Sequence, residues 1–316
     1  TTESLVPEIS WVRYTPSVQR IRIAYAMNLP RGLTEDRKRR QSERIPCPLI
    51  LEVQLTSGMK RLDFRVYFEN RVLEHRLQVV FLSPFSTAIS YAGAHFAVLP
   101  REGKKNFPQN EFVLIQEGGM SMAILSQGLR EYTLLARSGK TGLAITLLRA
   151  VGWLSRNDLL TRKGDAGWSL PTPGGQCLGR YEFSLALRIG RETFPESTIP
   201  WEALCFNRPP LLFQLKEKNL PITEWSLLCM DNPRILLSAL KKSEWGEELV
   251  LRLYNPTPRE EACVLTFTMP ILRIRELSLL EKEEGILLLS GNTLPLIFGP
   301  YEIKTLGILV SPEDAI

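Results

Sequence analysis

The chain has 316 residues, which is enough to bury a large core and to form two domains. Its 44% hydrophobic and 23% charged residues are typical of soluble globular proteins, and no apolar run approaches the ~20 residues that span a bilayer, so we expect no membrane partner. The net charge of +5 is modest and the basic residues are interspersed with acids, which favours a protein without a nucleic-acid partner.

The first predicted strand runs from Arg20 to Ala26, where apolar and polar side chains alternate. A polar segment from Leu33 to Arg44 follows and contains the basic cluster Arg37 to Arg40. Such clusters occur in nuclear-localisation signals and at phosphate-binding sites. Because three acids flank this one, we interpret the segment as a solvated loop.

Strands at residues 49–55, 62–68 and 77–82 follow in quick succession, and their pattern predicts an antiparallel meander. We expect a hairpin of strands at residues 112–116 and 122–125 and a further strand at residues 183–189. Short, evenly spaced strands are expected again at residues 235–239, 248–254, 264–269, 285–289 and 305–310. Proline-rich and polar stretches around residues 208–221 separate the two groups. We therefore predict an all-β fold, with a large antiparallel domain at 1–222 and a small β-sandwich at 223–316.

Few residues of the chain suit catalysis or metal binding. His75 and His95 are the two histidines, and no acid lies near them at a spacing typical of metal ligands, so we predict no metal site. No serine triad is visible. Gly139-Lys140 resembles the end of a phosphate-binding loop, but Leu134 occupies the position at which that motif requires glycine. We predict no catalytic residue, although the 34 acids could still supply a glycosidase carboxylate pair.

The densest concentration of specific residues lies in Gly142–Gly179. Residues 143–148 alternate with a period of two, which predicts a strand, and Arg149 falls in phase with its Leu/Ile face. An arginine in a core-facing row needs a partner, because an unpaired buried guanidinium costs several kcal/mol, on the order of an unpaired ion. We therefore expect Arg149 to meet a carboxylate, a row of carbonyls or a ligand.

A long irregular segment follows this strand, and its glycines and prolines predict a structured loop. The tryptophans and charged residues of the loop include Trp153, Arg156, Asp158, Arg162 and Trp168. Charged groups beside indole rings are typical of sugar-binding surfaces. Tryptophans that anchor the loop on a neighbouring domain are an equal alternative, and the two roles are compatible.

This loop resembles the signature segment of the C-terminal β-domains of family 38 α-mannosidases, especially the bacterial ones. The resemblance covers LLRAVGWLSRNDLLTRKGDAGWSLPTPGGQCLGRYEF at Leu147–Phe183. Three further segments agree in the same order: ENRVLEHRLQVVF at Glu69–Phe81, EFVLIQEGGMSMAILSQGLREYTLL at Glu111–Leu135 and RILLSALKKSEWGEELVLRLYN at Arg234–Asn255. The resemblance implies a large galactose-mutarotase-like supersandwich followed by a smaller β-sandwich.

The zinc ligands and the aspartate nucleophile of that family lie in an N-terminal α/β barrel, which no part of this chain resembles. The resemblance therefore implies a C-terminal piece of a zinc-dependent retaining α-mannosidase, inert alone and without a cofactor of its own. Its partners would be the catalytic barrel and an α-mannoside, and the first residue, Thr1, agrees with such a piece. The family's substrate-facing arginine makes Arg149 the first candidate for a sugar contact, and Arg156 and Asp158 are the next.

Two alternatives remain open. One is a stand-alone mutarotase or epimerase-like sugar enzyme, in which His75 and His95 would have to converge with an acid. The other is a non-catalytic carbohydrate-binding module of the same fold.

Five widely spaced cysteines form no C-x-x-C pair, which favours free thiols in a reducing compartment. They are Cys47, Cys177, Cys205, Cys229 and Cys263. The sequence also contains no Asn-x-Ser/Thr acceptor and begins with no signal-peptide pattern, so we predict a cytoplasmic protein. An apolar patch near Trp153 and Trp168 is expected to be exposed and to permit a homo-oligomer.

Overall fold

The computed structural model describes residues 1–158, 162–164, 166–214 and 224–311. The chain divides into two compact units, residues 1–90 with 101–191 and residues 91–100 with 192–316. The boundary predicted between residues 222 and 223 lies outside the described residues. Within the described ranges, no helix is long and apolar enough to cross a membrane.

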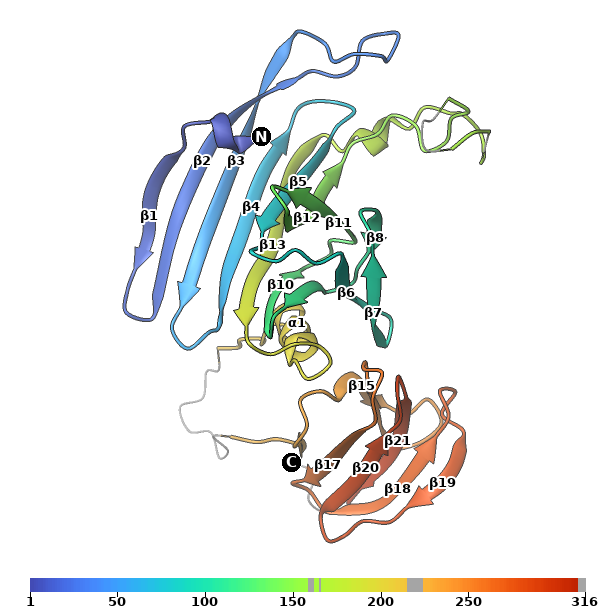
Figure 1. The fold of residues 1–316 in the computed structure, drawn as a ribbon. Helices are drawn as coiled ribbons and strands as arrows, with labels where there is room; N and C mark the ends of the chain where they lie inside the picture. The colour runs from blue at the N-terminus through green and yellow to red at the C-terminus, as the bar shows by residue number, and fades with distance from the viewer. Residues whose placement is uncertain (159–161, 165, 215–223, 312–316) are drawn as a thin grey trace. The chain divides into compact units, whose positions relative to one another are not determined.

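The first unit is built on an antiparallel sheet in which β1, β2, β3, β4, β13, β10 and β9 are neighbours in that order. Figure 1 shows β1 to β4 side by side with β13. The bounds of these strands are β1 (Glu8–Tyr14), β2 (Val18–Pro30), β3 (Arg44–Thr56), β4 (Arg61–Asn70), β9 (Phe112–Glu117), β10 (Met120–Ser126) and β13 (Gly179–Gly190). A short 3₁₀ turn, η1 (Thr2–Ser4), precedes them.

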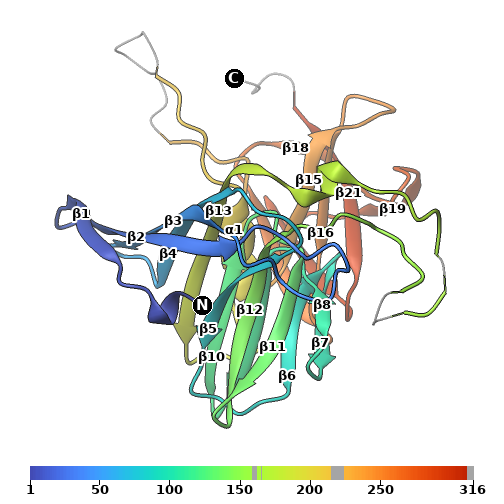
Figure 2. The same cartoon turned by 90° about the horizontal axis from the view of Figure 1, so that it is seen from above.

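A second antiparallel sheet of four strands, in the order β5-β12-β11-β8, packs on the first. Its strands are β5 (Arg76–Leu82), β8 (Asn106–Pro108), β11 (Glu131–Arg137) and β12 (Lys140–Arg149). Phe64 of β4 and Phe81 of β5 meet edge to face with ring centroids 5.4 Å apart, which joins the two layers. Figure 2 shows the strands of both sheets from above.

The core of this unit explains its strand pattern. The largest fully buried side chains come from both sheets and are Phe68, Leu114, Ile115, Ile124, Leu125, Tyr132, Leu143, Ile145 and Leu185. Strands β9, β10 and β12 are largely buried on both faces, which agrees with the high apolar content of their sequences. Tyr132 places its hydroxyl 2.8 Å from the Ser90 hydroxyl, so its polar end is satisfied inside the core.

Strand β1 is the edge of the first sheet, and every one of its residues is exposed. Its large apolar side chains include Ile9, Trp11 and Tyr14. The rings of Trp11 and Tyr14 contact each other edge to face, with their centroids 5.1 Å apart. This strand therefore keeps its apolar side chains in solvent, in contrast to the strands at the centre of the sheet.

The second unit is a small β-sandwich preceded by one helix, α1 (Ile199–Asn207). A three-stranded sheet has the order β14-β17-β20, and a five-stranded sheet has the order β15-β16-β21-β18-β19. The bounds are β14 (Leu228–Met230), β15 (Leu236–Lys242), β16 (Leu249–Tyr254), β17 (Glu261–Phe267), β18 (Ile271–Leu277), β19 (Glu283–Leu287), β20 (Thr293–Phe298) and β21 (Ile303–Val310). Residues 91–100 add parts of β6 (Ile89–Ala94) and β7 (Ala97–Glu102) to this unit.

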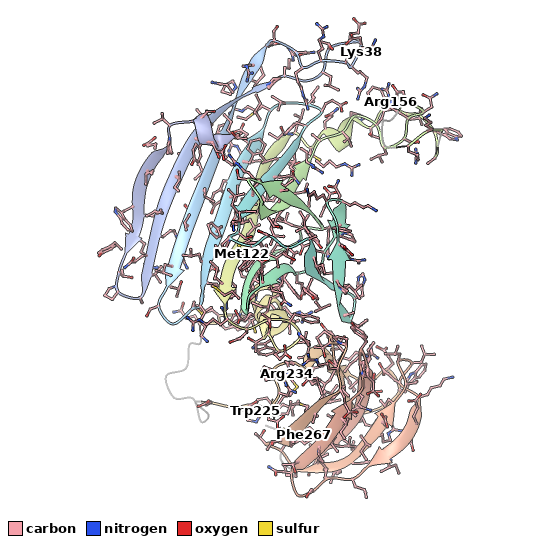
Figure 3. The ribbon with its side chains drawn as sticks, viewed as in Figure 1. Lys38, Met122, Arg156, Trp225, Arg234 and Phe267 are labelled. Atoms are coloured by element: carbon pink, nitrogen blue, oxygen red, sulfur yellow. The ribbon has the colours of Figure 1, made fainter. Side chains whose placement is uncertain are left out.

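The side chains between these two small sheets form one continuous apolar cluster that includes Ile235, Leu253, Leu265, Phe267 and Phe298. Phe267 is labelled in Figure 3, within the small sandwich. The predicted all-β fold class is confirmed. Helix α1 was not predicted, and its nine residues have no clear apolar stripe that a sequence pattern could reveal.

Phe298 and Ile297 of β20 form a matched pair, because neighbouring side chains of a strand point to opposite faces. Phe298 is fully buried and Ile297 is 62% exposed. We expect Phe298→Ala to lower the free energy of unfolding by about 3–5 kcal/mol, because it leaves a cavity in the core. Ile297→Ala should change it by about 0.5 kcal/mol or less. Urea denaturation measures both changes, and equal losses would contradict this packing.

Candidate functional site

The loop predicted to carry the site joins β12 to β13, and its two ends pair with each other. An isolated β-bridge joins Trp153 to Pro171. Backbone hydrogen bonds of 2.7 and 2.8 Å continue this pairing toward the strands. We call residues 150–153 and 171–177 the neck of the loop; the latter range includes a 3₁₀ turn, η2 (Pro173–Gln176). The neck fixes the direction in which the rest of the loop leaves the sheet.

Arg149 is the last residue of β12, and its side chain is exposed. A β-bulge between Thr146 and Leu148, in the pairing with β5, shifts the alternation so that Leu147 and Leu148 are both buried. Arg149 consequently faces solvent opposite Arg76. The prediction that Arg149 lies in a core-facing row is wrong. The role of Arg149 as a sugar contact stays a prediction.

The neck is held by Glu74, whose side chain is only 13% exposed. One carboxylate oxygen, Oε1, accepts hydrogen bonds from Gly152 N at 3.1 Å, Gln176 Nε2 at 3.0 Å and Arg37 Nη1 at 3.2 Å. The backbone N–H of Glu74 donates in return to Gln176 Oε1 at 2.8 Å. Glu74 also has a φ of +53°, in the left-handed region that side chains other than glycine rarely adopt. We call Glu74, Gly152, Gln176 and Arg37 the Glu74 clasp.

Both ends of the loop fit tightly into this clasp. A Cβ atom at Gly152 would lie 2.5 Å from Glu74 Oε1 and 2.7 Å from Gln176 Nε2, so a side chain at this position would displace the carboxylate. On the other end, the buried Asn70 donates from Nδ2 to the carbonyl oxygens of Gln176 and Cys177 at 3.0 and 2.7 Å. Both halves of the neck are therefore bonded to the turn before β5.

Trp153, the last residue of the first half of the neck, brings two cationic side chains together. The guanidinium carbons of Arg37 and Arg156 lie 4.8 and 4.9 Å from the centre of its ring. Arg156 also forms a two-pronged ion pair with Asp158, Nε to Oδ1 at 2.7 Å and Nη2 to Oδ2 at 2.6 Å. The hydrogen bonds from Arg156 hold the pKa of Asp158 below its usual value, and the same contact raises the pKa of Arg156. The structure thus brings two of the three predicted site residues, Arg156 and Asp158, into one group.

The basic cluster Arg37 to Arg40 contributes to this group, which the interpretation as a solvated loop did not anticipate. Lys38 and Arg39 are exposed, in agreement with that interpretation. Arg37 instead lies over an indole ring and pairs with the clasp carboxylate, and Arg40 donates to the carbonyl oxygen of Glu74. Figure 3 shows Lys38 and Arg156 at the same end of the first unit.

The two tryptophans of the loop differ in how far their indole rings are exposed to solvent. Trp153 is half-buried, and protein cations lie over its ring. Trp168 is 86% exposed, and Leu154 and Leu170 are also exposed. The sequence predicted an apolar surface near both tryptophans, and the structure leaves Trp168 as the indole that is open to solvent.

The two histidines show no catalytic arrangement. Burial lowers the pKa of His75, whose ring packs edge to face on Phe68 with centroids 6.3 Å apart. Its two ring nitrogens are buried and bond to no carboxylate in the described ranges. His95 lies in the exposed turn between β6 and β7. Across the part of the chain that the structure describes, no three His, Cys, Asp or Glu side chains lie close enough to hold a metal ion.

Sequence reasoning missed Glu74, Gln176 and Asn70. The triplet Glu74-His75-Arg76 drew attention to its histidine, because histidine is the residue type that suggests catalysis. The glutamate beside it carried no such signal. Gln176, in η2, and Asn70, at the end of β4, are ordinary polar residues, and their partners lie more than 100 positions away along the chain, so no local pattern marks them.

Known proteins are similar to this chain in sequence and in structure. The model of the family described as "Glycosyl hydrolases family 38 C-terminal beta sandwich domain" matches residues 234–306. A Halalkalibacterium halodurans protein named "Putative mannosylglycerate hydrolase" is 27% identical over 283 residues, which are 86% of this chain and 30% of that protein. The human "Alpha-mannosidase 2C1" is 30% identical over 139 residues, 42% of this chain and 13% of that protein. The chain thus spans about a third or less of the length of these relatives.

Two solved structures from Enterococcus faecalis share the fold. A protein of glycosyl hydrolase family 38 superposes with a TM-score of 0.80 at 23% identity, over 98% of this chain and 37% of its own length. An alpha-mannosidase from strain V583 superposes with a TM-score of 0.81 at 24% identity, over 98% of this chain and 36% of its own length.

The ion pair of Arg156 with Asp158 predicts a pH dependence. The folded pKa of Asp158 lies below its unfolded value, so the pair contributes to stability in full above the unfolded pKa and loses that contribution as the pH falls through the folded pKa. We expect Arg156→Gln to raise the pKa of Asp158 toward the ordinary value, as measured by NMR titration of the carboxyl carbons. Asp36, whose pKa is lowered chiefly by the Thr34 hydroxyl, should keep its low pKa in the variant. An unchanged titration of Asp158 would contradict the contact.

Proposed function

We propose that the chain is the C-terminal β-region of a glycosyl hydrolase family 38 enzyme, namely the β-domain part of a zinc-dependent retaining α-mannosidase; the family model that matches residues 234–306 and the Halalkalibacterium relative support this proposal. It would act on α-mannosidic bonds, in mannose metabolism, together with an N-terminal catalytic barrel. The β-domains would pack on that barrel and complete its substrate cleft. The chain alone would be inert as a hydrolase.

The observation that supports this proposal most directly is the coverage of the relatives. The similarity to the Halalkalibacterium protein extends over 86% of this chain and only 30% of that protein. The fold match to the Enterococcus alpha-mannosidase likewise covers 98% of this chain and 36% of that one. This coverage also supports the proposal that the chain is one part of a longer enzyme. The candidate site adds a chemical reason, because it presents donors and acceptors of the kind that bind sugar hydroxyls.

The geometry of Arg156 and Asp158 suits a pair of neighbouring hydroxyl groups. Arg156 uses Nε and Nη2 toward the carboxylate, which leaves the N–H groups of Nη1 to donate to a ligand. Each oxygen of Asp158 keeps a lone pair that can accept from a hydroxyl. The ring of Trp153 and the ion pair fix the guanidinium plane before a substrate arrives, which reduces the entropy lost on binding. In this proposal Arg149 supplies a further donor at the base of the loop.

The zinc ion and the nucleophile belong to the barrel in this proposal. The described residues of this chain hold no group of three His, Cys, Asp or Glu that fits a metal ion, so no step assigned to this chain passes through zinc. Its residues bind and orient the substrate, and the bond-breaking chemistry takes place on the other domain.

We place the protein in the cytoplasm. None of the five cysteines, all of which lie in the described residues, forms a disulfide, and Cys47 and Cys263 are buried, which suits a reducing compartment. Association of two copies through the exposed residues near Trp168 remains part of the proposal.

A carbohydrate-binding module is the second candidate, and the exposure of Trp168 favours it. Calorimetry of the isolated chain with mannose and mannobiose separates a binding module from an inert fragment. The epimerase alternative loses its main support, because the ring nitrogens of His75 bond to no carboxylate in the described ranges.

The isolated 316-residue chain should show no turnover of an aryl α-mannoside, with or without added zinc, because the groups that break the bond would lie on the barrel. Release of the aryl alcohol measures this directly. The longer enzyme that contains the chain serves as the positive control. Zinc-dependent turnover by the isolated chain would overturn the proposal.

In the longer enzyme, Arg156→Ala and Arg149→Ala should each lower kcat/KM for an aryl α-mannoside by about 10- to 100-fold, the effect of losing a hydrogen bond from a charged donor. Arg137→Ala is the matched control, since Arg137 is the last residue of β11 and pairs with Lys140, at the opposite end of β12 from Arg149. Steady-state kinetics of the three variants test the site. Unchanged kcat and KM in both Arg156→Ala and Arg149→Ala would refute their role.

A further inference from the structure

We propose that Glu74 is a positioning residue, which holds both ends of the loop so that Arg156 and Asp158 are presented in a fixed orientation. This inference rests on the proposed function for its consequence in substrate binding. The clasp itself is a feature of the chain alone. Nothing in the resemblance or in the similarity to known proteins assigns a role to Glu74.

One carboxylate oxygen of Glu74 connects the two ends of the loop. The carboxylate of Glu74 accepts from Gly152, at the start of the loop, and from Gln176, at its end. A single oxygen atom thus joins two points that are 24 positions apart along the chain. Removing the carboxylate leaves Gly152 N and Gln176 Nε2 without their partner, and both lie in partly buried surroundings.

Arg37 and Trp153 link the Glu74 clasp to Arg156 and Asp158. Arg37 binds the same carboxylate oxygen and lies over the Trp153 ring, and Arg156 lies over that ring as well. Glu74 therefore sets the position of Trp153 in two ways, through the neighbouring Gly152 and through Arg37. Trp153 in turn contacts the guanidinium that pairs with Asp158. Loosening the clasp would leave this group intact but free to turn relative to the sheet.

The backbone conformation of Glu74 supports the same role. Its φ of +53° is unfavourable for a residue with a side chain, and glycine would adopt it more easily. A glutamate at this position is therefore explained by what its side chain holds, since the turn alone favours glycine. In Glu74→Gly, a looser neck would therefore come from the loss of the carboxylate, because the backbone change alone relieves the turn.

The experiment measures hydrogen–deuterium exchange of the neck, residues 150–153 and 171–177, in the isolated chain. Glu74→Gly and Gly152→Ala should each raise the exchange rates of the neck amides by about tenfold or more, because the bonds that close the neck are lost. Glu74→Gln keeps an acceptor oxygen and should restore much of the protection. Thermal melting shows whether each variant remains folded.

Two matched controls isolate the clasp. Gly174→Ala changes a glycine of the same neck whose added Cβ would meet nothing within 4 Å. Ser138→Gly relieves a left-handed residue, with φ of +50°, in the β11–β12 turn. Neither should change exchange in the neck. Protection that is unchanged in both Glu74→Gly and Gly152→Ala would refute the clasp, whatever the enzyme does.

Kinetics of the longer enzyme test the positioning role separately. We expect Glu74→Gly to raise KM or lower kcat for an aryl α-mannoside by about tenfold, and Glu74→Gln to recover most of the loss. A loosened neck with wild-type kinetics, in an enzyme that depends on Arg156, would refute the positioning role. If Arg156→Ala and Arg149→Ala also leave kinetics unchanged, the proposed substrate contacts fail while the clasp stands.

Discussion

A largely buried carboxylate must be hydrogen-bonded, and the rest of the candidate site depends on how this requirement is met at Glu74. The donors come from three segments that are distant in sequence, represented by Arg37, Gly152 and Gln176. Each donor brings its own segment into place. The loop after β12 is therefore anchored at its base to the strand ends of a close-packed sandwich.

The sandwich contributes rigidity to this arrangement. The turn that carries Glu74 lies between β4 and β5, which belong to different sheets, and the two sheets are joined by the contact of Phe64 with Phe81. Asn70, at the end of β4, bonds to the carbonyl oxygens at the far end of the loop. A binding group built on such strand ends moves less than one carried by a free loop, and this favours a role in orienting a substrate.

The strands were predictable from the sequence because their alternation is a local property. The pattern at Phe183 to Ile189, for example, is found within β13, and the hairpin at Glu117 to Gly119 joins β9 and β10. Alternation failed at Arg149, because the bulge after Thr146 is set by pairing with β5 and leaves no mark in the strand itself. The clasp was also beyond local reasoning, since it depends on pairs of residues brought together only by the complete fold.

The exposed edge of strand β1 affects how the chain can associate with other polypeptides. Its outer row of N–H and C=O groups has no neighbouring strand among the described residues, and apolar side chains such as Trp11 flank it. An unpaired row of this kind is a template on which another extended segment can add as a further strand. Assembly by strand addition is thus available to this protein at the edge of its larger sheet, independently of any sugar.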